Sequence, residues 1–213
     1  MIKRFIKYCF WVLLIHPIVL VILGLNVRGR GHIPTKGPCI IIANHNSHLD
    51  TLVLTTLLPI HLLHRVRPVA AADYFLKNRV IRWFSLNLMG IIPMKRSSIR
   101  QRDPFVEVSK SLSNQEIILL YPEGTRGEPE QRQALKRGIA LLAKKHPDVP
   151  IIPVFMHGLG KSLPRNESLF VPFIADVFVG QALYWQGDRD QFMDQIHSVF
   201  AQLASQKQFP DWE

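Results

Sequence analysis

The chain has 213 residues, which is enough for one α/β domain with a substantial buried core and too short for two of ordinary size. It carries 26 Lys and Arg against 16 Asp and Glu, a formal net charge of +10, which favours a phosphate-bearing substrate or an anionic lipid surface as partner. The dispersed cations and the lack of zinc-finger or RNA-binding signatures argue against nucleic acid as partner. The chain has two cysteines, Cys9 and Cys39, which exclude a disulfide framework and fit a reducing, cytoplasmic setting.

An apolar run opens the chain. Residues 8–25 are eighteen positions without a formal charge, flanked by cations, which is near the lower limit for crossing a bilayer core of about 30 Å. Pro17 removes a helical hydrogen bond, so a single span and two short helical halves entering one leaflet both remain open. Trp11 and the flanking cations favour a membrane over a buried core helix, and the missing cleavage site disfavours a signal peptide. We expect residues 1–26 to form a membrane-associated helical segment and residues 27–213 the main domain.

The rest of the chain alternates between predicted strands and helices, which is typical of an α/β fold. Strands are expected at residues 38–43, 67–71, 116–121, 149–155 and 175–179, with a short strand or extended segment at 90–96. Helices are expected at residues 51–58, 74–89, 104–112 and 134–145, and an amphipathic helix carries Phe192, Ile196, Val199, Phe200 and Leu203 on one face. The helix at 74–89 mixes aromatic and basic residues, which suits either a membrane interface or a core helix with a solvated basic edge.

A polar heptad, NHNSHLD, follows the first strand at residues 44–50. His45 and Asp50 would lie apart on a continuous helix or strand, so they meet only if a strand-to-helix turn folds the chain back between them. Strand ends are where α/β sheets place ligand sites, and an imidazole held by a carboxylate is a general base near neutral pH. Because no serine lies in a G-x-S-x-G setting, His45 would act on a hydroxyl of the substrate itself.

Two other interpretations of the heptad remain open. Ser47 to Asp50 fits the S-x-x-[DE] capping pattern, in which Ser47 caps the next helix and His45 is merely a loop residue; taken alone, the heptad slightly favours this. A metal site would combine His45, His48 and Asp50, but no further Cys or Glu cluster stands at ligand spacing. We therefore expect no metal.

A second polar segment, YPEGTRG at residues 121–127, also ends a predicted strand. Backbone N–H groups freed by glycine, the Thr125 hydroxyl and the Arg126 guanidinium together suit a phosphate monoester. Glu123 would repel phosphate, so it is better placed to orient Arg126 or to accept a hydrogen bond from a substrate hydroxyl. The alternative is an ordinary Pro-Glu-Gly-Thr β-turn with a solvated arginine.

Four motifs occur together along the chain. They are N-H-x-S-x-x-D at 44–50, G-x-I-P-x-x-R at 90–96, Y-P-E-G-T-R at 121–126 and V-P-I-I-P-V at 149–154. In order and spacing they resemble the four blocks of the glycerolipid acyltransferases, the PlsC-like 1-acylglycerol-3-phosphate acyltransferase family, over residues 27–183. Departures are small: Tyr121 stands where phenylalanine is usual, and Gly127 where serine is common.

The resemblance implies an α/β fold, a single domain with a mixed, largely parallel sheet surrounded by helices, and a membrane-associated N-terminal helix with the catalytic domain on the cytoplasmic face. It implies direct transfer of an acyl group from acyl-CoA or acyl carrier protein, as co-substrate and without a cofactor, to the hydroxyl of a lysophospholipid. It assigns His45 as general base and Asp50 as its orienting partner. The residues it assigns to the acceptor's phosphate and glycerol are Arg96, Glu123, Gly124, Thr125 and Arg126.

Several functions remain open within this expectation. The leading acceptor is 1-acylglycerol-3-phosphate, which would give phosphatidic acid, with anionic membrane lipids as further partners. Relatives with the same blocks acylate lyso-ornithine lipid or lysophosphatidylethanolamine. A lipid hydrolase or thioesterase would replace the acceptor by water, and a non-catalytic lipid-binding membrane protein would not need both His45 and Asp50.

Overall fold

A seven-stranded sheet forms the centre of the computed structural model, which describes residues 2–75, 77–94, 103–127, 133–162 and 174–207. Its strands are β1 (Leu25–Arg28), β2 (Cys39–Ala43), β3 (Val66–Ala71), β4 (Ile92–Met94), β5 (Ile117–Leu120), β6 (Ile151–His157) and β7 (Ala175–Val179). They lie in the order β1-β7-β6-β2-β5-β3-β4. Neighbours run parallel except β6 and β7, which are antiparallel. The expected mixed, largely parallel sheet is confirmed.

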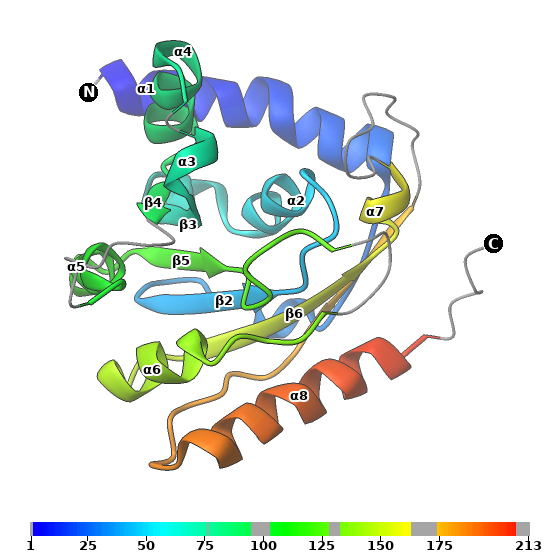
Figure 1. Cartoon of the computed structure of the whole chain (residues 1–213). Coiled ribbons are helices and arrows are strands. Elements are labelled where there is room, and N and C mark those ends of the chain that lie inside the picture. The colour runs from blue at the N-terminus through cyan, green and yellow to red at the C-terminus, as the bar shows by residue number, and fades with distance from the viewer. Residues whose placement is uncertain (1, 76, 95–102, 128–132, 163–173, 208–213) are drawn as a thin grey trace.

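Helices cover both faces of the sheet (Figure 1). The α-helices are α1 (Ile2–Cys9), α2 (Asp50–Leu57), α3 (Ala72–Phe75), α4 (Arg79–Phe84), α5 (Val106–Ser113), α6 (Gly138–Lys145), α7 (Leu159–Ser162) and α8 (Arg189–Ser205). Shorter 3₁₀ or π-helical segments are η1 (Phe10–Ile15), η2 (Ile18–Leu23), η3 (Arg30–His32), η4 (Ile60–Arg65) and η5 (Ser85–Met89). Side chains of α5, α6 and α8 form one buried cluster with the sheet, and those of η1, η2 and α2 form the other. The fold is therefore a sheet between two helical layers.

Strand β2 shows why the apolar run before the heptad is continuous. Successive side chains of a strand point to opposite faces. Ile40 and Ile42 enter the cluster on the α8 side, while Cys39, Ile41 and Ala43 enter the cluster on the α2 side. A strand buried on both faces needs apolar residues at every position. The polar heptad thus begins where a rigid central strand ends.

The C-terminal amphipathic helix is confirmed as α8. Asp188 caps its start by accepting a hydrogen bond from the Gln191 N–H at 2.7 Å. Its buried residues on the sheet side are Phe192, Met193, Ile196, Phe200 and Leu203. The 3.6-residue period alone located this contact face.

Three elements differ from the sequence prediction. The helix expected at 74–89 is divided into α3, α4 and η5, because the Asn78 side chain accepts the Ile81 N–H at 2.8 Å and starts a new helix. Helix α6 begins at Gly138 rather than at residue 134. Strand β1 was not predicted, and it pairs with β7, far away in sequence. The expected boundary after residue 26 lies within β1, so the N-terminal helix passes directly into the sheet.

The N-terminal segment is one continuous helical run from α1 through η2. Pro17 has helical angles of φ −60° and ψ −42°, and both segments next to it are π-helical. The His16 Nδ1 lies 3.0 Å from the Trp11 carbonyl oxygen, which gives this part of the run a side-chain hydrogen bond beside the proline. The run is therefore not broken into two halves at Pro17.

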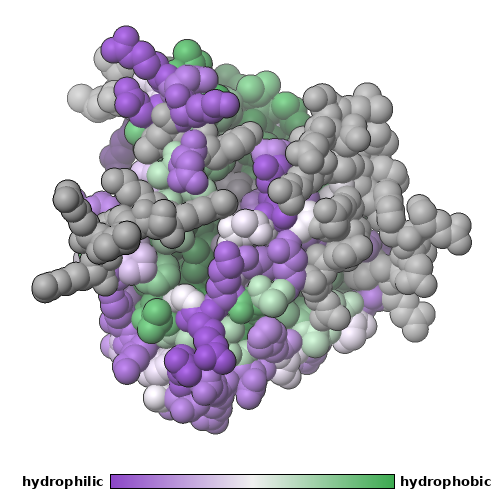
Figure 2. Space-filling view, viewed as in Figure 1, coloured by the Kyte–Doolittle hydropathy of each residue, from purple (hydrophilic) through white to green (hydrophobic). Residues whose placement is uncertain are grey.

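This helical run has two apolar faces with different surroundings. Trp11, Ile15, Val19 and Leu23 are spaced four apart and buried against the domain, and the Trp11 Nε1–H donates to the Leu88 carbonyl at 3.0 Å. The outward face exposes Phe5, Leu13, Leu14, Leu20 and Val21, and hydrophobic residues reach the surface along that edge of the molecule (Figure 2). Residues 4–21 are long and apolar enough to cross a membrane, a criterion that buried core helices and signal sequences also meet.

Helix α4 lies beside the first part of the N-terminal run (Figure 1). None of its side chains is buried, and Val80, Ile81, Trp83 and Phe84 are all exposed. Phe84 meets Phe10 edge to face, with ring centroids 5.5 Å apart. The core-helix interpretation of this segment therefore does not hold for α4, whose apolar side chains are open to the surroundings.

Candidate active site

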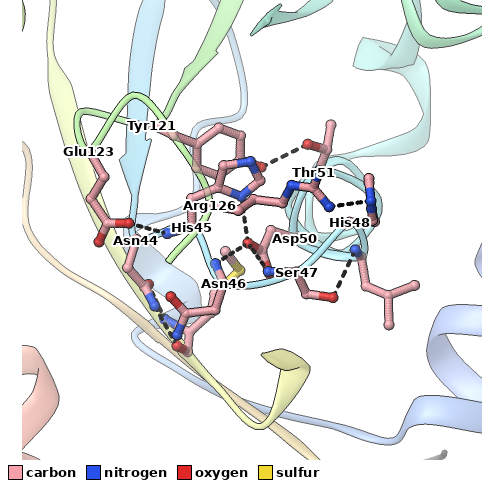
Figure 3. Close-up of polar contacts among 12 residues, drawn as sticks. Asn44, His45, Asn46, Ser47, His48, Asp50, Thr51, Tyr121, Glu123 and Arg126 are labelled. Carbon is pink, nitrogen blue, oxygen red and sulfur yellow. Dashed lines mark hydrogen bonds and ion pairs between the residues drawn. The ribbon is translucent and has the colours of Figure 1, made fainter. Parts of the chain in front are cut away.

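The heptad folds back on itself between β2 and α2, as the sequence required for His45 and Asp50 to meet. The His45 Nδ1–H donates to Asp50 Oδ2 at 2.8 Å. The same oxygen accepts the backbone N–H groups of Asn46 at 2.8 Å and Ser47 at 3.0 Å (Figure 3). Asp50 is 1% exposed. One buried carboxylate oxygen therefore fixes both the imidazole and the turn that carries it.

The capping interpretation of the heptad is compatible with this contact. The Ser47 Oγ accepts the Leu49 N–H at 3.2 Å, while the Ser47 N–H donates to Asp50. In a capping box the serine hydroxyl accepts the N–H three residues on; here it accepts that of Leu49, two residues on, so only the bond from the Ser47 N–H to Asp50 follows the box. Regular helix begins only at Asp50, with Leu49 at the N-cap position. The pattern therefore forms the turn that precedes α2, and the structural and chemical roles of Asp50 use the same atom.

The His45 ring is oriented and accessible. Because Nδ1–H points to a carboxylate, the lone pair lies on Nε2. The ring stacks on Tyr121, with centroids 4.0 Å apart and planes 16° apart. The Tyr121 hydroxyl lies 2.9 Å from the Thr51 Oγ1 on α2, and burial raises the pKa of Tyr121 well above its usual range. The His45 side chain remains 20% exposed, so a neutral aromatic wall supports an imidazole that a substrate can reach.

The YPEGTRG segment holds the backbone of His45 from both sides. The His45 N–H donates to Glu123 Oε2 at 3.1 Å, and the Gly127 N–H donates to the His45 carbonyl at 2.9 Å. Gly124 closes the turn with an N–H···O bond of 3.0 Å to the Tyr121 carbonyl. It does so at φ +76°, where a side chain would be strained and would also meet Lys136. The two motifs therefore form one site at the carboxyl ends of adjacent parallel strands β2 and β5.

Two backbone donors of this segment, which was predicted to bind phosphate, are used within the protein. The N–H groups of Gly124 and Gly127 donate to the carbonyl oxygens of Tyr121 and His45, so in this structure they are not free for phosphate. The Thr125 hydroxyl lies 3.5 Å from the Gln133 Oε1. Arg126 Nη1 donates to His48 Nε2. Thr125 and Arg126 are therefore the members of this segment whose side chains suit an anion.

His48 is a contact of Arg126 that sequence reasoning did not find. Burial and then the Arg126 charge lower the pKa of His48 below its ordinary value. A neutral imidazole can accept a hydrogen bond from a guanidinium, whereas a protonated one would repel it. His48 can thus hold Arg126 toward the site instead of binding a metal. Within the described part of the chain, no group of three or more His, Cys, Asp or Glu side chains is arranged to hold a metal ion.

Asn44 has a structural role that sequence reasoning did not identify. Its Nδ2–H donates to the Met156 carbonyl at 2.7 Å, and its Oδ1 accepts the Met156 N–H at 2.8 Å. The side chain thereby continues the β2–β6 pairing at the point where the chain leaves the sheet. In the sequence, only the position of this polar residue at the end of a predicted strand indicated such a role. Arg96, predicted to bind the acceptor, lies outside the described residues.

Glu123 is a buried carboxyl that titrates near neutral pH. It is 3% exposed. Burial raises its pKa to about 7. Hydrogen bonds from the backbone of His45 and Gln133 act in the opposite direction and lower the pKa. Above this pH the Glu123 carboxyl beside the His45 backbone is therefore negatively charged, and below this pH it is neutral.

Replacing Glu123 with glutamine is expected to stabilise the protein above pH 7. Because the folded pKa of about 7 exceeds the ordinary value of 4.5, the folded state holds the proton more tightly, and its stability falls as pH rises between those values. This loss of stability reaches about 3 kcal/mol. Glu123→Gln should avoid the loss because the amide stays neutral and still accepts the His45 N–H. Urea unfolding at about pH 5 and about pH 8 measures the effect. Glu107→Gln, on the exposed side of α5, is the control, and equal pH dependence in both variants would contradict the prediction.

The chain is similar in sequence to known proteins. The family model described as Acyltransferase matches residues 24–157. A 1-acyl-sn-glycerol-3-phosphate acyltransferase alpha from Mus musculus is 30% identical over 165 residues, covering 74% of this chain and 54% of the relative. A chloroplastic 1-acyl-sn-glycerol-3-phosphate acyltransferase from Brassica napus is 28% identical over 144 residues, covering 67% and 40%. The chain thus spans about half the length of these curated relatives, or less.

Two further similarities bear on acceptor and fold. A lyso-ornithine lipid O-acyltransferase from Rhizobium meliloti is 28% identical over 129 residues, covering 58% of this chain and 40% of the relative. The crystal structure of the 1-acyl-sn-glycerophosphate acyltransferase PlsC from Thermotoga maritima superposes with a TM-score of 0.76 and 16% identity, covering 98% of this chain and 83% of that one. This second similarity shows a shared fold.

Proposed function

This chain belongs to the acyltransferase family, and from that membership we propose that it transfers a fatty acyl group from acyl-CoA or acyl carrier protein to the hydroxyl of a lysophospholipid. The acceptor we propose is 1-acylglycerol-3-phosphate, with phosphatidic acid as product. The names of the mouse and Brassica relatives support this acceptor. The observation that carries the proposal is the contact between His45 and Asp50, beside the segment that bears Arg126.

The chemistry begins with the acceptor hydroxyl. Its proton passes to His45 Nε2 as its oxygen attacks the thioester carbonyl, and the Asp50 carboxylate stabilises the imidazolium through Nδ1–H. Collapse of the tetrahedral intermediate forms the ester and breaks the C–S bond, and the leaving thiolate takes the proton back from His45. A thioester is already activated, so no protein nucleophile is needed. A positioned base supplies about 10²- to 10⁴-fold in rate, and orientation of the two substrates supplies much of the rest.

Acceptor binding is assigned to the segment that follows β5. Arg126 can bind a phosphate with two parallel N–H···O bonds, and Thr125 adds a hydroxyl, with Arg96 as a further predicted contact. The proposed role of Glu123 is to accept a hydrogen bond from the glycerol part. A second candidate acceptor is lyso-ornithine lipid, favoured by the similarity to the Rhizobium meliloti protein. Its carboxylate would suit the same guanidinium.

We also propose that the protein works on a membrane surface, with the domain on the cytoplasmic face. The exposed apolar residues of the N-terminal run and of α4 lie together along one edge (Figures 1 and 2). The opposite face of the run is docked on the domain through Trp11 and its neighbours. This geometry supports a helix that lies in one leaflet with the domain beside it, so that lipid substrates reach the site from the membrane.

A panel of lyso-lipid acceptors, each offered with one radiolabelled acyl-CoA, tests this function. We expect label in phosphatidic acid with 1-acylglycerol-3-phosphate. Arg126→Ala should raise the acceptor KM by roughly 10- to 100-fold, because a charge-assisted hydrogen bond contributes about 1.5–3 kcal/mol, and should leave the donor KM within about twofold. Arg189→Ala, on α8, is the matched control.

The same panel has outcomes that would overturn parts of the proposal. Label released as free fatty acid at the same rate with and without acceptors would indicate a hydrolase. Fastest transfer to lyso-ornithine lipid would establish the second candidate acceptor. Equal rises of donor and acceptor KM in Arg126→Ala would refute the assignment of this residue to the phosphate.

A further inference from the structure

A basic pocket lies between the start of the N-terminal helix and η4. It has a volume of about 230 Å³, and its lining includes Arg4, Lys7, His61 and His64, together with Tyr8 and Ile60. No Asp or Glu is among the described residues that line it. Arg4 and Lys7 are the cations of this lining, whereas burial and then the Arg4 charge lower the pKa of His64. A site with two cations and no carboxylate suits an anion.

This pocket is separate from the candidate active site. Segment η4 ends at Arg65, directly before the start of β3, and the Lys7 ammonium lies close to Gly90 and to the first residue of β3, Val66. His45 instead follows the carboxyl end of β2. Because β2, β5 and β3 are parallel, the pocket and the candidate active site lie at opposite ends of these strands.

Lys7 is the unusual member of the pocket. Its residue is 6% exposed, and its ammonium nitrogen is buried without a hydrogen-bond partner among the described residues. Glu116, whose charge favours protonated Lys7, is paired with Arg67. Burial and then the Arg67 charge lower the pKa of Lys7 to about 8, with Glu116 acting in the opposite sense. A buried ammonium without a hydrogen-bond partner is unfavourable, and an anion in the pocket would add a second negative charge to that of Glu116.

The mouth of the pocket combines this charge with exposed apolar groups. Of the lining residues, Tyr8 is 47% exposed and Ile60 40%. Phe5, next to Arg4 on α1, is 69% exposed and belongs to the outward apolar face of the N-terminal run. A ligand that carries an anionic head and an apolar tail matches such a surface better than a free anion does.

We propose that this pocket binds the phosphate group of an anionic phospholipid and thereby fixes the N-terminal helix on the membrane. A water in the liquid takes up about 30 Å³, so a pocket of about 230 Å³ holds a phosphate with a few waters and leaves the acyl chains outside, in the bilayer. The inference rests on the proposed membrane association and is independent of acyl transfer, because binding is measured without an acyl donor.

Vesicle binding of the full chain tests the proposal. The vesicles are phosphatidylcholine alone, or an equal mixture of phosphatidylcholine and phosphatidylglycerol. Arg4→Gln and Lys7→Met are each expected to lower the affinity for mixed vesicles by more than tenfold and to leave binding to phosphatidylcholine unchanged. Arg82→Gln, which removes an exposed charge from α4 outside the pocket, is the matched control. One charge near an anionic surface contributes about fivefold, so an equal loss in all three variants would indicate diffuse attraction and overturn the pocket.

A second measurement separates a lipid headgroup from free phosphate. The imidazole signals of His61 and His64 are followed by NMR while inorganic phosphate is added, with His64→Gln used for assignment. A saturable shift that Arg4→Gln abolishes, together with preference for the mixed vesicles, supports the proposal. A saturable shift without any vesicle preference would replace the lipid by free phosphate, and no shift at all would overturn the site.

Folding of the Lys7 variant provides an internal check. Methionine keeps much of the side-chain length and removes the buried charge, so Lys7→Met should raise Tm while lowering the affinity for mixed vesicles. Arg4 is exposed, so Arg4→Gln should leave Tm unchanged and still weaken binding. A loss of binding that occurs only together with a lower Tm would indicate misfolding and count against the pocket.

Discussion

Replacing His45 with alanine is expected to lower kcat for acyl transfer by about 10²- to 10⁴-fold, with both KM values changed little. The substitution removes the proposed base but leaves the backbone bonds of His45 to Glu123 and Gly127 in place. The His45 side chain is partly exposed, so its loss should not unfold the protein. Steady-state kinetics with 1-acylglycerol-3-phosphate and acyl-CoA measure the effect, and circular dichroism checks the fold.

Two controls make this result specific. His197→Ala removes an exposed histidine from α8 and should leave kcat unchanged. Added imidazole should restore part of the activity of His45→Ala, because the alanine leaves space beside Tyr121 and Asp50 for a free base. Full activity of His45→Ala without added base would rule out the proposed mechanism.

Asp50 variants should show the second large effect, because one carboxylate holds both the proposed base and the turn before α2. Asp50→Ala removes the acceptor of the His45 Nδ1–H and of two buried backbone N–H groups, those of Asn46 and Ser47. Each unpaired buried donor costs about 1–3 kcal/mol, so the free energy of unfolding should fall by roughly 2–5 kcal/mol. Activity should fall about 10²-fold or more as the imidazolium loses its counter-charge. Urea unfolding and kcat, measured in parallel, report the two losses.

Asp50→Asn separates the two roles. Its amide oxygen can still accept the backbone N–H groups of the turn, so stability should stay within about 1 kcal/mol of the unsubstituted protein. It cannot balance the positive charge that develops on His45, so kcat should remain low. If Asp50→Asn instead keeps full kcat, the carboxylate serves only the turn, and the capping interpretation of the heptad would be sufficient.

The two polar segments act together because the sheet brings them together. Tyr121 stacks on His45 and reaches Thr51 on α2. Phenylalanine, usual at this position in the family, would keep the stacking but lose the hydroxyl contact. Glu123 and Gly127 bond to the backbone of His45. A change in the segment after β5 can therefore move His45, the proposed base, without touching a substrate.

The sequence alone determined the features of the fold that depend on residues close together in the chain. The strands β2, β5, β6 and β7, the helix α8 and the start of α2 follow from hydrophobic period and turn chemistry, which act over a few positions. The requirement for a turn between His45 and Asp50 also followed from their spacing, because neither a helix nor a strand could bring them together. The break of the helix expected at 74–89 is a local error, since Asn78 is a capping residue that the sequence displayed.

Only the tertiary structure decided what joins residues far apart in the chain. The bond from the His45 N–H to Glu123 crosses 78 positions, and the Asn44 contacts with Met156 cross 112. The pairing of β1 with β7, the bond from the Gly127 N–H to the His45 carbonyl and the burial of Lys7 depend likewise on which strands and helices become neighbours. Local preferences do not encode that choice. It is made by the packing of two apolar faces on one sheet, which places His45, Arg126 and the basic pocket at fixed positions around it.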